Sequence, residues 1–332
     1  MGATRRGMLL AGAAMTAAGM PARPALAQGQ RPEDWPNQTV RYINLYAAGG
    51  ATDIASRAWC QAMSTLTGQQ FVVENRAGGG GTVGTDAIAK ARPDGYTLGL
   101  GSVATLAIAP HLFRSLPYDA ERDFTYIGGL WRQPNLLLVN NDVPARNAAE
   151  LVALLKRDPG RYSYAIGGIG TTPHLAAELF KTLAGVELPS VSYRGGAPAL
   201  VDVIAGRVQV LMDNFSGPIG AARDGRLRAI AVTSLQRSPV APDVPTLAES
   251  GFPGFDVTSW NGVVAPAGLP PELVRHMNAL TRRALESTEV IRNYTETGAS
   301  TWPTSPEEYR AYRDRQSVLM ADLVKKSGAK VE

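Results

Sequence analysis

Short apolar runs alternate along most of the chain with longer segments whose apolar residues recur at helical spacing. This alternation is typical of an α/β fold with parallel sheets. A first series predicts strands at 40–45, 71–73 and 96–100, and helices at 52–66, 82–91 and 105–113.

A second series of the same kind follows. It predicts strands at 136–139, 162–166, 191–193, 208–212 and 227–232, and helices at 148–157, 173–184, 197–205 and near Gly220. Segment 236–254 is rich in Pro and Gly and is predicted to be irregular, and 257–264 is predicted to be extended. Helices are expected at 270–286, 289–297 and 306–326, the last with Ser305 as its N-cap. Two α/β series closed by a helical tail predict two lobes.

The N-terminal segment has the pattern of an export signal. Arg5-Arg6 is followed by an apolar run at 7–19 and by the small-x-small sequence Ala25-Leu26-Ala27. The run is shorter than the roughly 20 residues that span a bilayer, although an uncleaved anchor remains the alternative. We therefore predict export to the periplasm with cleavage near Ala27, by either the twin-arginine or the general secretory route.

Removal of residues 1–27 changes the charge of the chain. The full sequence has a formal net charge of +4, and the leader carries three arginines and no acid, so the remainder has +1. No basic run interleaved with aromatic residues is present, which argues against nucleic acid as a partner. The lone Cys60 cannot form an intramolecular disulfide, and its apolar helical surroundings predict a small core residue.

Two glycine-rich loops each follow a predicted strand and open a helix. The first contains Gly49-Gly50 with Asp53 in the helix that follows, and the second runs through 167–174, with Thr172 as the expected N-cap and Pro173 as the first helical residue. Backbone N–H groups and a helix N-terminus together favour an anion such as a carboxylate. For Asp53, a structural role is favoured over ligand contact: its carboxylate would hold the loop in place or stabilise the helix dipole.

Asp213-Asn214 ends another predicted strand. Ligands of open α/β sheets lie beyond such strand ends, so this pair is a further candidate. A turn-forming role for the two side chains is an equal alternative.

The loop at 79–84 matches the pattern G-x-G-x-x-G between a strand and a helix, which raises the alternative of a nucleotide-dependent enzyme. That fingerprint needs an acid at the end of the next strand, and the sequence there is Gly99-Leu100-Gly101-Ser102. The three histidines, His111, His174 and His276, fall in predicted helices and are expected to be structural. With no catalytic or metal-binding motif, we predict a protein that is not an enzyme and needs no cofactor or metal.

Many segments, in order, resemble one family, the tripartite tricarboxylate transporter substrate-binding proteins, also called Bug receptors. The resemblance spans Trp35 to Lys326. It is carried by Gly49-Gly50 with Asp53, 73–78 (Val-Glu-Asn-Arg-Ala-Gly), 93–98 (Pro-Asp-Gly-Tyr-Thr-Leu), 116–119 (Leu-Pro-Tyr-Asp), 193–199 (Tyr-Arg-Gly-Gly-Ala-Pro-Ala), Asp213-Asn214, 243–246 (Asp-Val-Pro-Thr) and 265–268 (Ala-Pro-Ala-Gly).

The resemblance implies a two-lobed periplasmic binding protein, type II-like, with a ligand cleft between the lobes. By analogy residues 28–138 and 262–332 form lobe 1 and 139–261 form lobe 2. The implied ligand is a small carboxylate, and the implied partners are the membrane subunits of a transporter, or alternatively a sensor kinase. A monomer is expected. The positions that match the family's ligand loops are Tyr46, Ala47, Ala48, Gly49, Gly50, Asp53, Ser102, Gly168, Gly170, Thr171, Thr172, Asp213 and Asn214.

Two departures from the family pattern bear on the ligand. Ala48 stands where the family usually has Pro, and Ile166 and Ile169 replace polar residues of the second loop. A less polar cleft disfavours a highly charged ligand, because unmade hydrogen bonds are costly. We therefore expect a monocarboxylate or an aromatic carboxylate in preference to a tricarboxylate.

Overall fold

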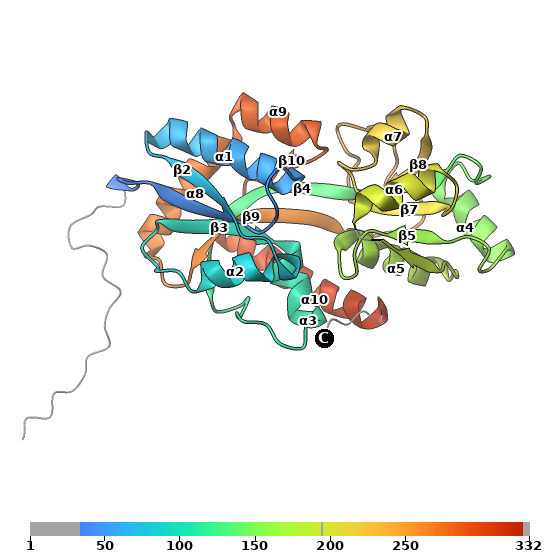
Figure 1. Cartoon of the computed structure of the whole chain (residues 1–332), viewed down its shortest axis with the longest axis horizontal. Coiled ribbons are helices and arrows are strands. Elements are labelled where there is room, and N and C mark those ends of the chain that lie inside the picture. The colour runs from blue at the N-terminus through green and yellow to red at the C-terminus, as the bar shows by residue number, and fades with distance from the viewer. Residues whose placement is uncertain (1–33, 194, 328–332) are drawn as a thin grey trace, which may run out of the picture.

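The computed structural model describes residues 34–193 and 195–327, so the predicted export signal at 1–27 lies outside the described residues. The described chain folds into two α/β lobes that lie side by side and are joined by two long strands (Figure 1). The predicted α/β class is confirmed. The sheets are mixed rather than purely parallel, because the joining strands pair antiparallel with their neighbours.

Lobe 1 is built on three parallel strands covered by helices on both faces. Its elements are β1 (Val40–Asn44), α1 (Ala51–Thr67), β2 (Phe71–Asn75), η2 (Gly79–Gly81), α2 (Thr82–Ala89), β3 (Thr97–Ser102), η3 (Ala104–Ile108), α3 (Ala109–Leu112), α8 (Pro271–Leu285), α9 (Thr288–Glu296), β10 (Ser300–Thr301) and α10 (Pro306–Ser327).

Lobe 2 repeats the parallel arrangement around β5, which pairs with β6 on one side and β7 on the other. Its elements are α4 (Ala148–Arg157), β5 (Tyr164–Ile166), α5 (Thr172–Ala184), β6 (Ser190–Ser192), α6 (Gly196–Ile204), β7 (Val210–Asn214), α7 (Ile219–Arg223) and β8 (Leu227–Val232). The exact lobe boundaries expected from the family resemblance stay a prediction.

The strands β4 (Phe124–Asn140) and β9 (Thr258–Pro266) cross between the lobes. β4 pairs with β9 in lobe 1 and with β7 and β8 in lobe 2. The sequence predicted only its last part, at 136–139, because Gly128, Gly129 and Pro134 interrupt the apolar pattern of a strand.

One glycine of each crossing strand, Gly129 of β4 and Gly262 of β9, has a packing role that local sequence does not reveal. A Cβ atom on Gly129 would lie 2.4 Å from the carbonyl oxygen of Trp302, and one on Gly262 would lie 2.5 Å from the ring of Tyr309. The absent side chains therefore let Trp302 and Tyr309 lie directly against the crossing strands.

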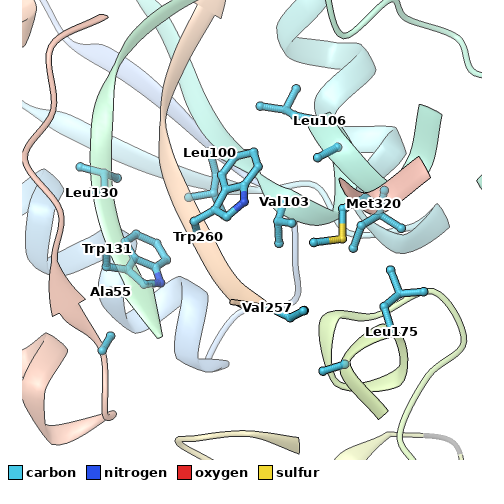
Figure 2. Close-up of a cluster of buried hydrophobic side chains, with 14 of the residues drawn as sticks. Ala55, Leu100, Val103, Leu106, Leu130, Trp131, Leu175, Val257, Trp260 and Met320 are labelled. Atoms are coloured by element: carbon cyan, nitrogen blue, oxygen red, sulfur yellow. The ribbon is translucent and has the colours of Figure 1, made fainter. Parts of the chain in front are cut away.

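An aromatic cluster anchors the crossing strands in the core. The ring centroid of Trp260 lies 6.3 Å from that of Trp302 and 6.0 Å from that of Tyr309, and its side chain is fully buried. Figure 2 shows Trp260 and Trp131 on the neighbouring strands β9 and β4. Burying a large aromatic side chain stabilises the fold by roughly 2–3 kcal/mol, so this cluster fixes where the two strands leave lobe 1.

Most predicted helices begin and end within two residues of their expected positions. Ser305 caps α10 as expected: its hydroxyl accepts from the N–H of Glu308 at 3.1 Å, and the Glu308 carboxylate accepts from the N–H of Ser305 at 2.8 Å. The expected helix at 105–113 is instead a π-helical turn followed by the short α3, and β10 was not predicted. Within the described ranges, no helix is long and apolar enough to cross a membrane.

Candidate ligand-binding cleft

A cavity of about 300 Å³ lies between the lobes, beside the crossing strands. Lobe 1, lobe 2 and both crossing strands all contribute to its wall. The lining residues are Tyr46, Ala51, Thr52, Ser102, Val103 and Ala104 from lobe 1, Thr171, Thr172, Asn214 and Ser216 from lobe 2, and Gln133, Ser259 and Asn261 from β4 and β9.

The first wall is the N-terminus of α1. Gly50 is its N-cap and offers no side chain, so Ala51 and Thr52 bring backbone N–H groups without an intrahelical acceptor to the cavity. Ordered peptide dipoles give this end of the helix a positive partial charge. The residues therefore favour an anionic group without placing a cationic side chain there.

Asp53 holds the loop in front of this helix. Its carboxylate is 2% exposed and accepts from the N–H of Gly49, from Arg57 and from the side-chain amide of Asn75, at 2.8–2.9 Å. Burial opposes its ionisation, but the Arg57 guanidinium and the Gly49 N–H outweigh burial and lower the pKa of Asp53. Asp53 is thus a positioning residue for the loop and is not among the cavity's lining residues.

The second wall is the N-terminus of α5. The N-cap is Thr171, one residue earlier than the predicted Thr172, because the Thr171 side chain accepts from the N–H of His174. Thr172 is therefore the first helical residue and Pro173 the second. His174 Nδ1 accepts from the N–H of Gly170 at 3.1 Å and so fixes the loop that precedes the helix.

A chain of hydrogen bonds joins lobe 2 to the crossing strands at the cavity floor. The Ser259 hydroxyl donates to Asn214 Oδ1 at 2.8 Å and lies 2.7 Å from the Thr172 hydroxyl, which contacts Asn135 Oδ1 at 3.3 Å. Because Asn214 Oδ1 is occupied by this bond, its Nδ2 amide is the group left to donate to a ligand.

On the lobe 1 side, hydroxyl groups form a similar cluster. Ser102 Oγ lies 3.2 Å from Thr105 Oγ1 and 3.5 Å from the phenol oxygen of Tyr46. Burial raises the pKa of Tyr46, so its phenol stays protonated and remains a hydrogen-bond donor.

The structure brings five of the thirteen predicted site residues to the cavity wall: Tyr46, Ser102, Thr171, Thr172 and Asn214. Loop residues Ala47, Ala48, Gly49 and Gly50 are exposed at its edge, next to Ala51. Gly168 and Gly170 lie in the loop before α5.

The side chain of Asp213 does not line the cavity. A Cβ on Gly196 would lie 2.3 Å from its Oδ2 atom, so its carboxyl faces the start of α6. Burial raises the pKa of Asp213, opposed by a hydrogen bond from the N–H of Asn214.

Sequence reasoning missed the residues that the crossing strands contribute. Ser259 and Asn261 alternate with the buried Trp260 in a segment predicted to be extended, and this polar–apolar–polar pattern places both on one face. This alternation is visible in the sequence and could have identified both residues. Gln133 lies in the part of β4 that the sequence did not predict, and nothing in the local pattern identifies it.

The two isoleucines that replace polar residues do not line the cavity. Ile166 is buried in β5 and Ile169 is 56% exposed in the loop that follows. The departure from the family pattern therefore leaves the cavity wall rich in hydroxyl and amide groups.

The chemistry of the cavity is that of a binding site. Tyr46 is the one titratable side chain among its described lining residues. In the described ranges no group of His, Cys, Asp and Glu side chains is arranged to hold a metal ion. The wall offers neutral hydrogen-bond partners and helix termini.

The G-x-G-x-x-G loop packs into lobe 1. A Cβ on Gly84 would lie 2.8 Å from the Leu45 side chain and 2.9 Å from the carbonyl oxygen of Arg76, and one on Gly81 would lie 2.9 Å from Thr105. These glycines thus permit close packing of α2 against β1, and none of them lines the cleft.

The family model described as "Tripartite tricarboxylate transporter family receptor" matches residues 55–329. Protein BugT of Bordetella pertussis (strain Tohama I) is 34% identical over 301 residues, which cover 90% of this chain and 92% of BugT.

Two solved structures are similar over whole chains. R. palustris Rpa4515 with adipate has a TM-score of 0.78 and 34% identity, covering 90% of this chain and all of that one. MatC (Rpa3494) from Rhodopseudomonas palustris with bound malate has a TM-score of 0.73 and 32% identity, and the match covers 87% of this chain and 100% of that one. The chain therefore belongs to the tripartite tricarboxylate transporter receptor family, a family of periplasmic solute-binding proteins and not of enzymes.

Proposed function

We propose that this receptor captures a small carboxylate in the cleft between its lobes. The observation that carries the proposal is that the N-termini of α1 and α5, one from each lobe, line the same cavity. Two helix N-termini favour one anionic group between them. The adipate and malate bound by the two similar structures support the same class of ligand.

Within that class, a monocarboxylate or aromatic carboxylate is favoured over a tricarboxylate. The described wall supplies no Arg, Lys or His to the cavity, so each further negative charge would lose its water without gaining a counter-charge. Val103, Ala104 and the ring of Tyr46 offer apolar surface to the rest of the ligand. The support is thus the neutrality of the wall and not the two isoleucines.

The receptor acts in the periplasm after cleavage near Ala27, as a monomer that delivers its ligand to the membrane subunits of a tripartite tricarboxylate-type transporter. Ligand binding draws the lobes together, and the transporter recognises the closed form. The family assignment supports the transporter as the partner.

A thermal-shift screen tests the proposal with benzoate, butyrate, adipate, malate and citrate, and with sugars and nucleotides as other classes. A ligand at 100 times its Kd stabilises the folded protein by about 2.7 kcal/mol, which raises the melting temperature by several degrees. We expect the monocarboxylates to give the largest shift. If citrate gave the largest shift, the preference for monocarboxylates would be wrong. If a nucleotide raised the melting temperature and no carboxylate did, the proposed carboxylate-receptor function would be wrong.

A further inference from the structure

A second hollow, of about 550 Å³, lies on the other flank of the crossing strands, and we call it the back groove. Strand alternation separates it from the cleft: on β9, Ser259 and Asn261 line the cleft while Thr258 lines the back groove. The two hollows share only Gln133 among their described lining residues. Its walls come from both lobes, with β10 and Trp302 on one side and segment 234–239 with Asp256 on the other.

Arg132 presents a guanidinium to this groove and has no ionic partner among residues 34–193 and 195–327. The group lies 5.6 Å from the ring centroids of both Trp302 and Tyr312, and its Nη1 donates to the Tyr312 hydroxyl at 3.4 Å. No carboxylate of the described chain lies within 4.0 Å of it. The two rings hold the cation in place by cation–π attraction, and the remaining N–H groups are left to bind an anion.

Asp256 supplies the opposite charge to the same groove. It is half-buried and makes no ion pair within the described chain. Burial raises the pKa of its carboxyl, whereas the nearby Arg132 and the N–H of Leu235 lower it. The two charges are thus close enough to influence one another, yet they are held apart rather than joined.

The other charged side chain among the described lining residues of the back groove, Arg237, already has partners. Arg237 donates to the Glu249 carboxylate at 2.9 Å and to the carbonyl oxygen of Pro242 at 3.0 Å. The remaining wall is partly apolar, with Trp302 on one side and Pro239 and the 54% exposed Leu235 on the other. Among its described lining residues, the groove therefore combines one cation and one carboxylate that make no ion pair, together with an apolar surface.

We propose that the back groove binds a free α-amino acid. Its α-carboxylate pairs with Arg132, since a guanidinium matches a carboxylate with two parallel hydrogen bonds. Its ammonium pairs with Asp256, and its side chain lies against Leu235 and Trp302. This site is separate from the cleft, because Arg132 and Asp256 do not line the cleft.

Calorimetric titration with three probes of one shape tests the proposal. The protein's cleft is first saturated with the carboxylate that binds there most tightly, so that only binding at the back groove is measured. L-Leucine carries both charges, 4-methylpentanoate lacks the ammonium, and 3-methylbutylamine lacks the carboxylate. We expect leucine to bind at least tenfold more tightly than either analogue. Variants that neutralise one charge should change which probe binds best. Asp256→Asn should weaken the binding of leucine at least tenfold and strengthen the binding of the acid. Arg132→Gln should weaken the binding of leucine and strengthen the binding of the amine.

An exchange of preferences is a result that misfolding cannot give, and urea unfolding of both variants checks their fold. Thr172→Val, at a residue that lines the cleft and not the back groove, should leave the affinity for leucine unchanged. The proposal fails if leucine does not bind, if the acid binds as tightly as leucine, or if Thr172→Val and not Arg132→Gln removes the binding of leucine.

Discussion

At the scale of single residues, the cleft depends on hydroxyl groups that are bonded to one another before any ligand arrives. Thr172, Ser259 and Asn214 form one connected chain at its floor. Each member fixes the direction in which its neighbour donates, so the free donors are oriented in advance. Such preorganisation lowers the entropic cost of binding.

Replacing Thr172 with Val should weaken carboxylate binding about tenfold. Valine keeps the shape of the side chain but removes the hydroxyl that contacts Ser259 and Asn135, and a lost hydrogen bond costs about 1–1.5 kcal/mol. Titration calorimetry measures the change. The matched control is Thr182→Val on the same helix, where the hydroxyl donates to the carbonyl oxygen of Glu178. Equal affinities for the two variants would remove Thr172 from the site.

A glycine pair tests the contact between the lobes. Gly298 (φ +74°) lies against lobe 2, where a Cβ would come 2.0 Å from Phe215, whereas Gly160 (φ +73°) has nothing within 4 Å. Gly160→Ala should lose about 1 kcal/mol of unfolding free energy from backbone strain alone. Gly298→Ala should lose a further 1–3 kcal/mol or so from overpacking. Urea unfolding of both variants gives the difference. Equal losses of unfolding free energy would show that Phe215 moves aside at no cost.

At the scale of elements, the site is made by where helices start. The starts of α1, α5 and α10 were predictable to within one residue, because Gly, Ser, Thr and Pro signal a helix N-terminus locally. Placing Thr172 as the cap of α5 was wrong by one position, since two consecutive threonines offer the same signal and only the bond to His174 distinguishes them.

The crossing strands were harder to predict for a physical reason. Gly128, Gly129 and Pro134 read as breaks in a strand. β4 nevertheless continues through them, because residues from far along the chain pack against its glycines: Asn278 against Gly128 and Trp302 against Gly129. Gln133 was missed along with this strand. Tertiary contacts, which no local window contains, decide such positions.

Acidification should loosen the loop before α5. Burial lowers the pKa of His174, so the folded state binds a proton less readily than the unfolded state, whose histidine titrates near pH 6.5. The resulting stability is complete above about pH 6.5 and is lost as the pH falls through the lowered pKa of the folded state. Protonation also removes the Nδ1 acceptor for the Gly170 N–H, so ligand affinity should fall in the same range.

Titrating the ligand at pH 7 and pH 5 measures this effect. His174→Asn keeps an acceptor near the Nδ1 position and should flatten the dependence of affinity on pH. The control is His111→Asn: burial lowers the pKa of His111 as well, but its ring bonds to Ser317, away from the cleft. The account is wrong if the His111 variant, and not the His174 variant, flattens the profile.

At the scale of the whole molecule, two strands and a helix connect the lobes. β4 and β9 carry the chain across, and α10 packs against both β4 and α5 (Figure 1). Figure 2 shows Met320 of α10 beside Leu175 of α5. A rotation of one lobe on the other is therefore expected to bend the crossing strands while α10 keeps its contact with lobe 2.

Small-angle X-ray scattering tests that motion. Closure of the cleft on a carboxylate should reduce the radius of gyration, because the lobes approach one another. Adding the same carboxylate to the Thr172→Val variant at a concentration well below its Kd should leave the profile unchanged. Identical profiles of the wild-type protein with and without saturating ligand would contradict closure.

The most direct measurement of the central claim is a crystal structure of the protein with the carboxylate that binds most tightly. The account predicts the carboxylate group between the N-termini of α1 and α5, within hydrogen-bond distance of the N–H groups of Ala51 or Thr52 and of Thr171 or Thr172. A carboxylate seated away from both helix ends, or a cleft that stays empty at saturating concentration, would contradict it.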